Sequence, residues 1–150
     1  EYIMNCQEFT TFLQEQIPLT AAMQLQTDFF SKEKIRLSVP LAPNKNDKNT
    51  GFGGSIACLL TVFGWSMMYA NFQTQFPDAK IVVQKSELRY LAPITDDFYA
   101  VCQCTDIAAK ESVCENLQRH GKGKLFLHID CYCKDVLSAT LDGTYYIIQA

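Results

Sequence analysis

The feature that most constrains this chain is a long stretch without charge. No Asp, Glu, Lys or Arg occurs between Lys48 and Asp78. Residues 56–69 within it read Ile-Ala-Cys-Leu-Leu-Thr-Val-Phe-Gly-Trp-Ser-Met-Met-Tyr, which offers no polar face. A helix that is apolar all round must be covered nearly all round, so we predict a buried central helix. A membrane span is disfavoured, because such a span needs about 20 apolar residues and small or polar residues interrupt this shorter run.

Three glycines stand where this helix should begin. The sequence there is Asn49-Thr50-Gly51-Phe52-Gly53-Gly54-Ser55. Such a density of glycine marks backbone that adopts unusual angles or approaches another group closely. The unpaired N–H groups and the dipole at a helix start form a site for negative charge or for a developing oxyanion. A glycine-rich loop that only packs tightly explains the same residues equally well.

Composition excludes several classes of function. The 150 residues have the length of one domain, and a net charge of −3 leaves no basic footprint for nucleic acid. The seven cysteines are an odd number and no signal peptide is evident, so we expect a reduced, cytoplasmic protein. The Cys-x-Cys pairs are expected to be small buried residues, with no metal. Neither His120 nor His128 has a partner at a spacing typical of a metal ligand or a triad.

The remaining sequence predicts mostly strands. A lead-in helix within residues 1–17, capped by Asn5, is expected to end at Pro18. Alternating apolar residues predict strands over residues 23–30, 34–41, 80–91, 97–105, 124–133 and 136–150. One further helix is expected at residues 108–120. The economical arrangement is an α+β fold, in which a curved antiparallel sheet of five to six strands wraps round the central helix in one domain, 1–150. One sheet cannot cover the far side of that helix, so a homodimer is expected, with a tetramer left open.

Three motifs resemble a known family. Residues 42–55 read Ala-Pro-Asn-Lys-Asn-Asp-Lys-Asn-Thr-Gly-Phe-Gly-Gly-Ser, and Gly64-Trp65 and Tyr90-Leu91-Ala92-Pro93 follow. With the order of elements, they resemble the hotdog-fold acyl-thioester enzymes. More closely, they resemble the thioesterase domain that is also attached to an N-acetyltransferase domain in some bacterial proteins. The chain lacks the acyl-CoA pyrophosphate loop of that second domain, so acetyltransferase activity is not expected.

The resemblance implies roles at the helix start. Hotdog enzymes use this end of the central helix to polarise the thioester carbonyl, which places catalysis on the backbone around Phe52, Gly53 and Gly54. Ser55 is the adjacent catalytic candidate. Phe52 is also a candidate for substrate binding, as is Tyr90 in the third motif.

The resemblance also implies a role for an asparagine before the double glycine, which commonly orients substrate or water. Asn46 matches this position, and Asn44 is a weaker candidate for substrate binding. Both residues would equally suit a turn that only holds the loop. Asn49 departs from the glycine usual in related sequences, but Asn tolerates the left-handed conformation.

A second departure lies within the helix. Many hotdog thioesterases place an Asp or Glu seven residues after the position of Gly54 to activate water, and this chain has Thr61 there. A neutral hydroxyl is a poor general base. Thr61 shares a helix face with Gly54, Cys58 and Gly64, a stripe that would either let another element pack closely or make room for an acyl chain or pantetheine.

Three functions follow from these residues. The first is hydrolysis of an acyl thioester, with the Gly53 and Gly54 amides as oxyanion hole and Asn46, Ser55 or Thr61 positioning water. The second, implied by relatives of the resembled domain that help start fatty-acid synthesis, is decarboxylation of a malonyl thioester such as malonyl-ACP. That reaction needs a stabilised enolate but no water-activating base. The third is a non-catalytic module that binds acyl thioesters. In each, the partner is an acyl-CoA or an acyl carrier protein, and CoA or phosphopantetheine arrives as part of the substrate, with no separate cofactor.

Overall fold

The computed structural model describes residues 3–149 and shows an α+β arrangement with a long central helix. Two helices open the chain, α1 (Cys6–Gln16) and α2 (Leu19–Ala22), and a hairpin of β1 (Gln26–Phe30) and β2 (Lys34–Val39) follows. A short 3-10 turn (Ala42–Asn44) precedes the central helix α3 (Gly53–Met68), which continues into a π-helical turn (Tyr69–Gln73). The rest is β3 (Lys80–Tyr90), β4 (Phe98–Gln103), α4 (Ile107–His120), β5 (Lys122–Cys133) and β6 (Val136–Ile148).

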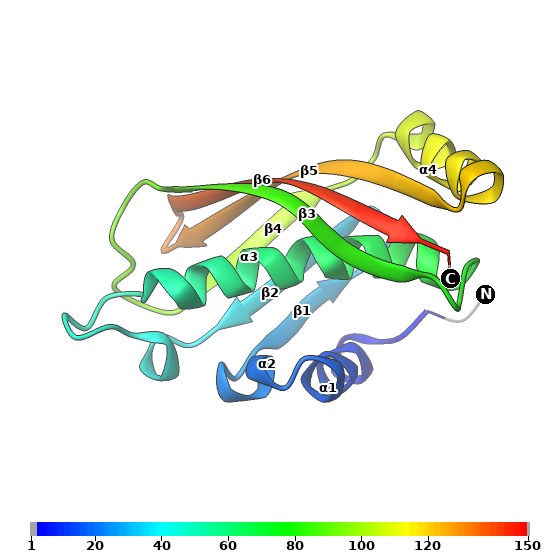
Figure 1. The fold of residues 1–150 in the computed structure, drawn as a ribbon. Coiled ribbons are helices and arrows are strands. Elements are labelled where there is room, and N and C mark those ends of the chain that lie inside the picture. Colours follow the sequence, from blue (N-terminus) through cyan, green and yellow to red (C-terminus); the bar gives the residue numbers. More distant parts are fainter. Residues whose placement is uncertain (1–2, 150) are drawn as a thin grey trace.

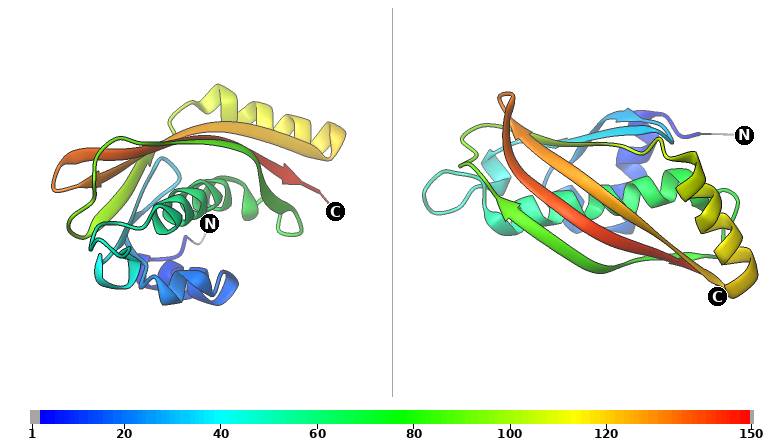
Figure 2. Two further views of the ribbon diagram at one scale, coloured as in Figure 1. Left: turned by 60° about the vertical axis from the view of Figure 1, so that its left-hand side comes forward. Right: turned by 90° about the horizontal axis from the view of Figure 1, so that it is seen from above.

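Within residues 3–149, six strands form one antiparallel sheet in the order β1-β2-β4-β5-β6-β3. The sheet curves round α3, and α1 and α2 lie on the far side of that helix from the longer strands (Figures 1 and 2). Strand β5 shows why the sheet has two faces. Its residues Leu125, Leu127 and Ile129 are buried against the core, and the residues between them face solvent.

The three main helices begin in different ways. Asn5 caps α1 in a capping box with Glu8, and Asp106 caps α4 by accepting from the Ala109 amide. Helix α3 begins after Phe52, whose side chain cannot cap. The central helix therefore starts with its first amides unprotected.

Close packing fixes α3 against β6. A Cβ at Gly64 would lie 2.0 Å from the ring of Tyr145, so only glycine leaves room for that buried ring. The Tyr145 hydroxyl donates to the Thr61 carbonyl at 2.9 Å. Burial raises the pKa of this phenol, which keeps it protonated and able to donate.

One side of α3 is less covered than the charge-free sequence predicts. Leu59, Leu60 and Phe63 are buried, whereas Cys58 and Thr61 are only half-buried, and the Phe52 ring is 52% exposed. By length and composition alone, Gly53–Gln73 could cross a membrane, a criterion that core helices of soluble proteins also meet. We call the surface formed by exposed Gly54 and by half-buried Cys58, Thr61 and Trp65 the open side of α3.

The predicted fold class is confirmed. All predicted elements are present, and most boundaries differ by one to three residues. Glu1, Tyr2 and Ala150, which fall in the predicted first segment and last strand, lie outside the described residues. The cysteines of β4 and β5 are buried and free, as predicted for small core residues, and residues 3–149 contain no cluster of three or more ligands suited to a metal.

Candidate functional site

The start of α3 presents three free backbone donors. The Phe52 amide is satisfied by the Asn44 carbonyl at 2.8 Å, and the Ile56 amide by the Phe52 carbonyl at 3.0 Å. Between them, the amides of Gly53, Gly54 and Ser55 have no hydrogen-bond acceptor among residues 3–149. Three aligned N–H groups at the positive end of a 16-residue helix are suited to hold an oxygen that gains negative charge.

A cleft of about 340 Å³ opens beside these amides. Gly51, Gly53 and Ile56 form one wall, and the end of β3 with the loop after it, Tyr90 to Ile94, forms the other. A bond from the Gly51 amide to the Ile94 carbonyl, at 2.8 Å, ties the two walls together. Tyr90 is 55% exposed, and its hydroxyl donates to the Gly53 carbonyl at 3.0 Å. The predicted residues Gly53 and Tyr90 are thus brought together.

Asn46 is tied up within its own loop. Its side-chain Oδ1 accepts from the amides of Lys48 at 2.9 Å and Thr50 at 3.2 Å, and its Nδ2 donates to the Thr50 hydroxyl at 2.9 Å. The structure gives Asn46 a loop-holding role. A further role in orienting substrate or water stays a prediction.

Asn44 is buried beneath the same loop, with 1% of its surface exposed. Its Nδ2 donates to the carbonyls of Met23 at 2.9 Å and Pro40 at 2.8 Å, and its backbone carbonyl holds the Phe52 amide. The only atom left for substrate is Oδ1, which is buried and has no partner within the described chain. Asn44 therefore braces the entry to α3, and its predicted contact with substrate stays untested.

The side chains along the open side of α3 are all neutral. Ser55, Cys58 and Thr61 follow one another within the first nine residues of the helix, and all three are half-buried. Burial raises the pKa of the Cys58 thiol, so it stays protonated at neutral pH and is not an activated nucleophile. The Phe52 ring lies over Gly54, where a Cβ would come within 2.5 Å of it.

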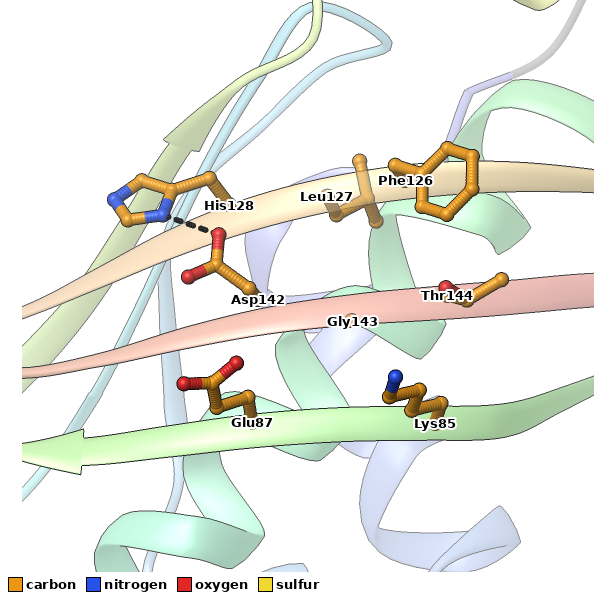
Figure 3. Close-up of a pocket in the computed structure, with 8 residues that line it drawn as sticks. All are labelled: Lys85, Glu87, Phe126, Leu127, His128, Asp142, Gly143 and Thr144. Atoms are coloured by element: carbon orange, nitrogen blue, oxygen red, sulfur yellow. Dashed lines mark hydrogen bonds and ion pairs between the residues drawn. The ribbon is translucent and has the colours of Figure 1, made fainter.

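A second hollow, of about 360 Å³, lies on the sheet face turned away from α3 (Figure 3). His128 is held there between two carboxylates, with Nδ1 at 2.7 Å from Asp142 Oδ1 and Nε2 at 2.8 Å from Asp130 Oδ1. The hydrogen bond to Asp142, aided by the charge of Asp130, raises the pKa of His128. Alternation along β5 places Asp130 on the same face as His128, but nothing in the sequence indicated Asp142, because that residue comes from the neighbouring strand. With both nitrogens occupied, this imidazole is not a free base, so the helix start is the better candidate for chemistry.

Comparison with known proteins agrees with this choice. A family model described as "Putative thioesterase (yiiD_Cterm)" matches residues 6–149. The chain belongs to this family. A crystal structure from Shewanella oneidensis, described as that of a "putative thioesterase", is 30% identical with a TM-score of 0.82, over 97% of each chain.

Two further solved structures share the fold. A protein of unknown function from Chlorobaculum tepidum has 25% identity and a TM-score of 0.88, over 96% of this chain and 94% of that one. A Pseudomonas aeruginosa protein described as "Probable Thioesterase" has 17% identity and a TM-score of 0.85, over the full length of both chains. The architecture is thus the hotdog arrangement of a thioesterase family.

Proposed function

We propose that this protein hydrolyses acyl thioesters of CoA or of an acyl carrier protein at the start of α3. The observation that carries the proposal is the set of three amides, of Gly53, Gly54 and Ser55, that have no acceptor in the described part of the chain and lie beside an open cleft. As water attacks the thioester carbon, charge develops on the carbonyl oxygen, and donors fixed in advance stabilise that charge without reorganising. Removing one such donor typically costs about 10²–10³ in kcat.

A second candidate, decarboxylation of a malonyl thioester, is favoured by one specific observation. Ser55, Cys58 and Thr61 are neutral, and no Asp or Glu occurs between Lys48 and Asp78. Hydrolysis needs a group that activates water, whereas loss of CO2 needs only an oriented carboxylate and a stabilised enolate oxygen. The same amides serve either reaction.

The proposed active form is a homodimer. The open side of α3 leaves apolar surface for a second copy to cover, and β3 is an edge strand whose Val82 and Val83 are 43% and 42% exposed. The unpaired backbone groups of an edge strand are a template for pairing with another chain. A second copy paired there would complete the cleft beside Tyr90 and could supply the group that activates water.

One experiment separates the reactions. The purified protein is incubated with malonyl-CoA and with medium-chain acyl-CoA, and then with the matching carrier-protein thioesters. Free thiol supports hydrolysis, whereas CO2 with acetyl thioester supports decarboxylation. Saturable binding without either product would contradict both catalytic proposals and support a binding module.

A further inference from the structure

Tyr90 links the end of the sheet to the first peptide of the central helix. It is the last residue of β3, and it pairs with Ala139 of β6. The next two amides, of Leu91 and Ala92, both donate to the Ser138 carbonyl, at 2.8 and 3.2 Å. These bonds hold the backbone of Tyr90 against the sheet. From there its hydroxyl reaches the Gly53 carbonyl, 37 positions away in the sequence, at 3.0 Å.

The Gly53 carbonyl belongs to the same planar peptide unit as the Gly54 amide. A bond to that carbonyl therefore fixes the direction in which the Gly54 N–H points. It also polarises the peptide and strengthens the N–H as a donor, an effect of about 10–30% per bond. The Gly54 amide is one of the three donors without an acceptor in the described part of the chain.

Apart from the helical geometry of α3, few groups restrain this peptide. Gly53 and Gly54 have no side chains to restrict their backbone, and Phe52 provides no side-chain cap. The Tyr90 ring lies over Gly53, where a Cβ would meet its atoms at 3.6–3.7 Å, an ordinary packing distance. Contact with Tyr90 thus replaces the restraint that a larger residue or a cap would supply.

We propose that Tyr90 is a positioning residue, which aims and polarises the Gly54 amide toward the thioester oxygen rather than contacting the substrate itself. This inference rests on the proposed function, because it takes the helix start to be the oxyanion site. It differs from the sequence-based expectation, in which Tyr90 contacts substrate. A substrate contact would act mainly on binding, whereas a donor aimed at the transition state acts on kcat.

The test is Tyr90→Phe, which removes only the hydroxyl. The matched control is Tyr132→Phe on the outer face of the sheet, where the ring stacks with Tyr99. Losing one neutral hydrogen bond predicts a fall in kcat of about threefold to tenfold with KM within about twofold. The amide nitrogen resonance of Gly54 should move in Tyr90→Phe and stay in place in Tyr132→Phe.

The kinetic constants and the Gly54 resonance together separate the positioning role of Tyr90 from the proposed function. A raised KM with unchanged kcat, or an unmoved Gly54 resonance, would overturn the positioning role. A wild-type protein without turnover on any thioester would overturn the proposed function and the catalytic part of this inference. The Gly54 resonance would still test separately whether Tyr90 acts on the Gly54 amide. A moved resonance together with the fall in kcat supports both.

Discussion

At the scale of single residues, the site depends on what is missing at the start of α3. Asn5 and Asp106 each accept from one amide in the first turn of their helices, that of Glu8 and that of Ala109, whereas Phe52 caps none. The amides of Gly53, Gly54 and Ser55 have no acceptor among residues 3–149. An unpaired donor destabilises a helix start, and an Ncap Ser, Thr, Asp or Asn typically contributes about 1 kcal/mol. A chain that gives up this stabilisation keeps the donors available for a ligand.

Gly53 allows one amide to be removed with little strain. Gly53 is the first residue of the helix and Phe52 before it is extended, with ψ 130°, which suits a following proline. We expect Gly53→Pro to lower kcat by about 10²–10³ if its N–H contacts the oxyanion. Gly53→Ala keeps the N–H and is the control. Steady-state kinetics measure kcat for both variants. Equal kcat values for Gly53→Pro and Gly53→Ala would show that the Gly53 amide does not stabilise the oxyanion.

His128 predicts a pH dependence of stability. Its pKa in the folded protein is raised above the ordinary 6.5, first by the hydrogen bond to Asp142. The charged imidazole therefore stabilises the fold fully below pH 6.5, and this contribution is lost as the pH rises through the raised folded value. We expect the wild type to have a larger free energy of unfolding than His128→Gln at pH 5, and this difference to shrink as the pH rises to about 9. Urea unfolding of both proteins across this range measures it. A constant difference would contradict the assignment.

At the scale of elements, the contact between α3 and β6 shows how one glycine sets a packing distance. In an exposed helix, Gly→Ala gains about 1 kcal/mol from propensity. At Gly64 the added methyl would lie 2.0 Å from the Tyr145 ring, and overpacking of a core typically costs about 1–3 kcal/mol. The packing cost outweighs the propensity gain.

We therefore expect Gly64→Ala to lower the free energy of unfolding by up to about 2 kcal/mol, as chemical denaturation would measure. The control is the same substitution in a Tyr145→Leu background, where the ring is gone and propensity alone remains. There Gly64→Ala should be neutral or stabilising. An equal loss in both backgrounds would show that the ring is not the cause.

The sequence predicts local features well and contacts between strands poorly. The charge-free stretch and the alternation along β5 depend on neighbouring residues, so α3 and the buried face of β5 could be predicted directly. The bonds of Tyr90 to Gly53 and of His128 to Asp142 join residues 37 and 14 positions apart. Such pairs depend on strand order, which spacing within one strand cannot reveal.

At the scale of the whole molecule, α3 is incompletely covered by its own chain. The sheet lies on one side of α3 and α1 on another (Figure 2), whereas the open side of α3 is exposed or half-buried, and β3 is a free edge of the sheet. Covering that surface buries apolar area, which stabilises by about 25 cal/mol per Å² before the cost of association. A second copy placed there would act on stability and on the cleft together.

If a second copy pairs at the β3 edge, disrupting that edge should lower the molecular mass in solution and the thioester turnover together. Replacing Val82 and Val83 by lysine puts two charges on the β3 edge, where like charges would meet across a symmetric interface. We expect sedimentation to shift from dimer to monomer and thioester turnover to fall with the dimer fraction. The control is Phe126→Lys on the outer face, where the side chain is 71% exposed.

The variant Phe126→Lys also tests whether two dimers pair into a tetramer. If two dimers pair through their outer sheet faces, Phe126→Lys should halve the mass and leave turnover intact, because the helix start lies on the opposite side of the sheet. If the β3 variant keeps both its mass and its turnover, the edge strand is not the interface. Turnover retained by a true monomer would show instead that the free amides of Gly53, Gly54 and Ser55 work within a cleft formed by one chain.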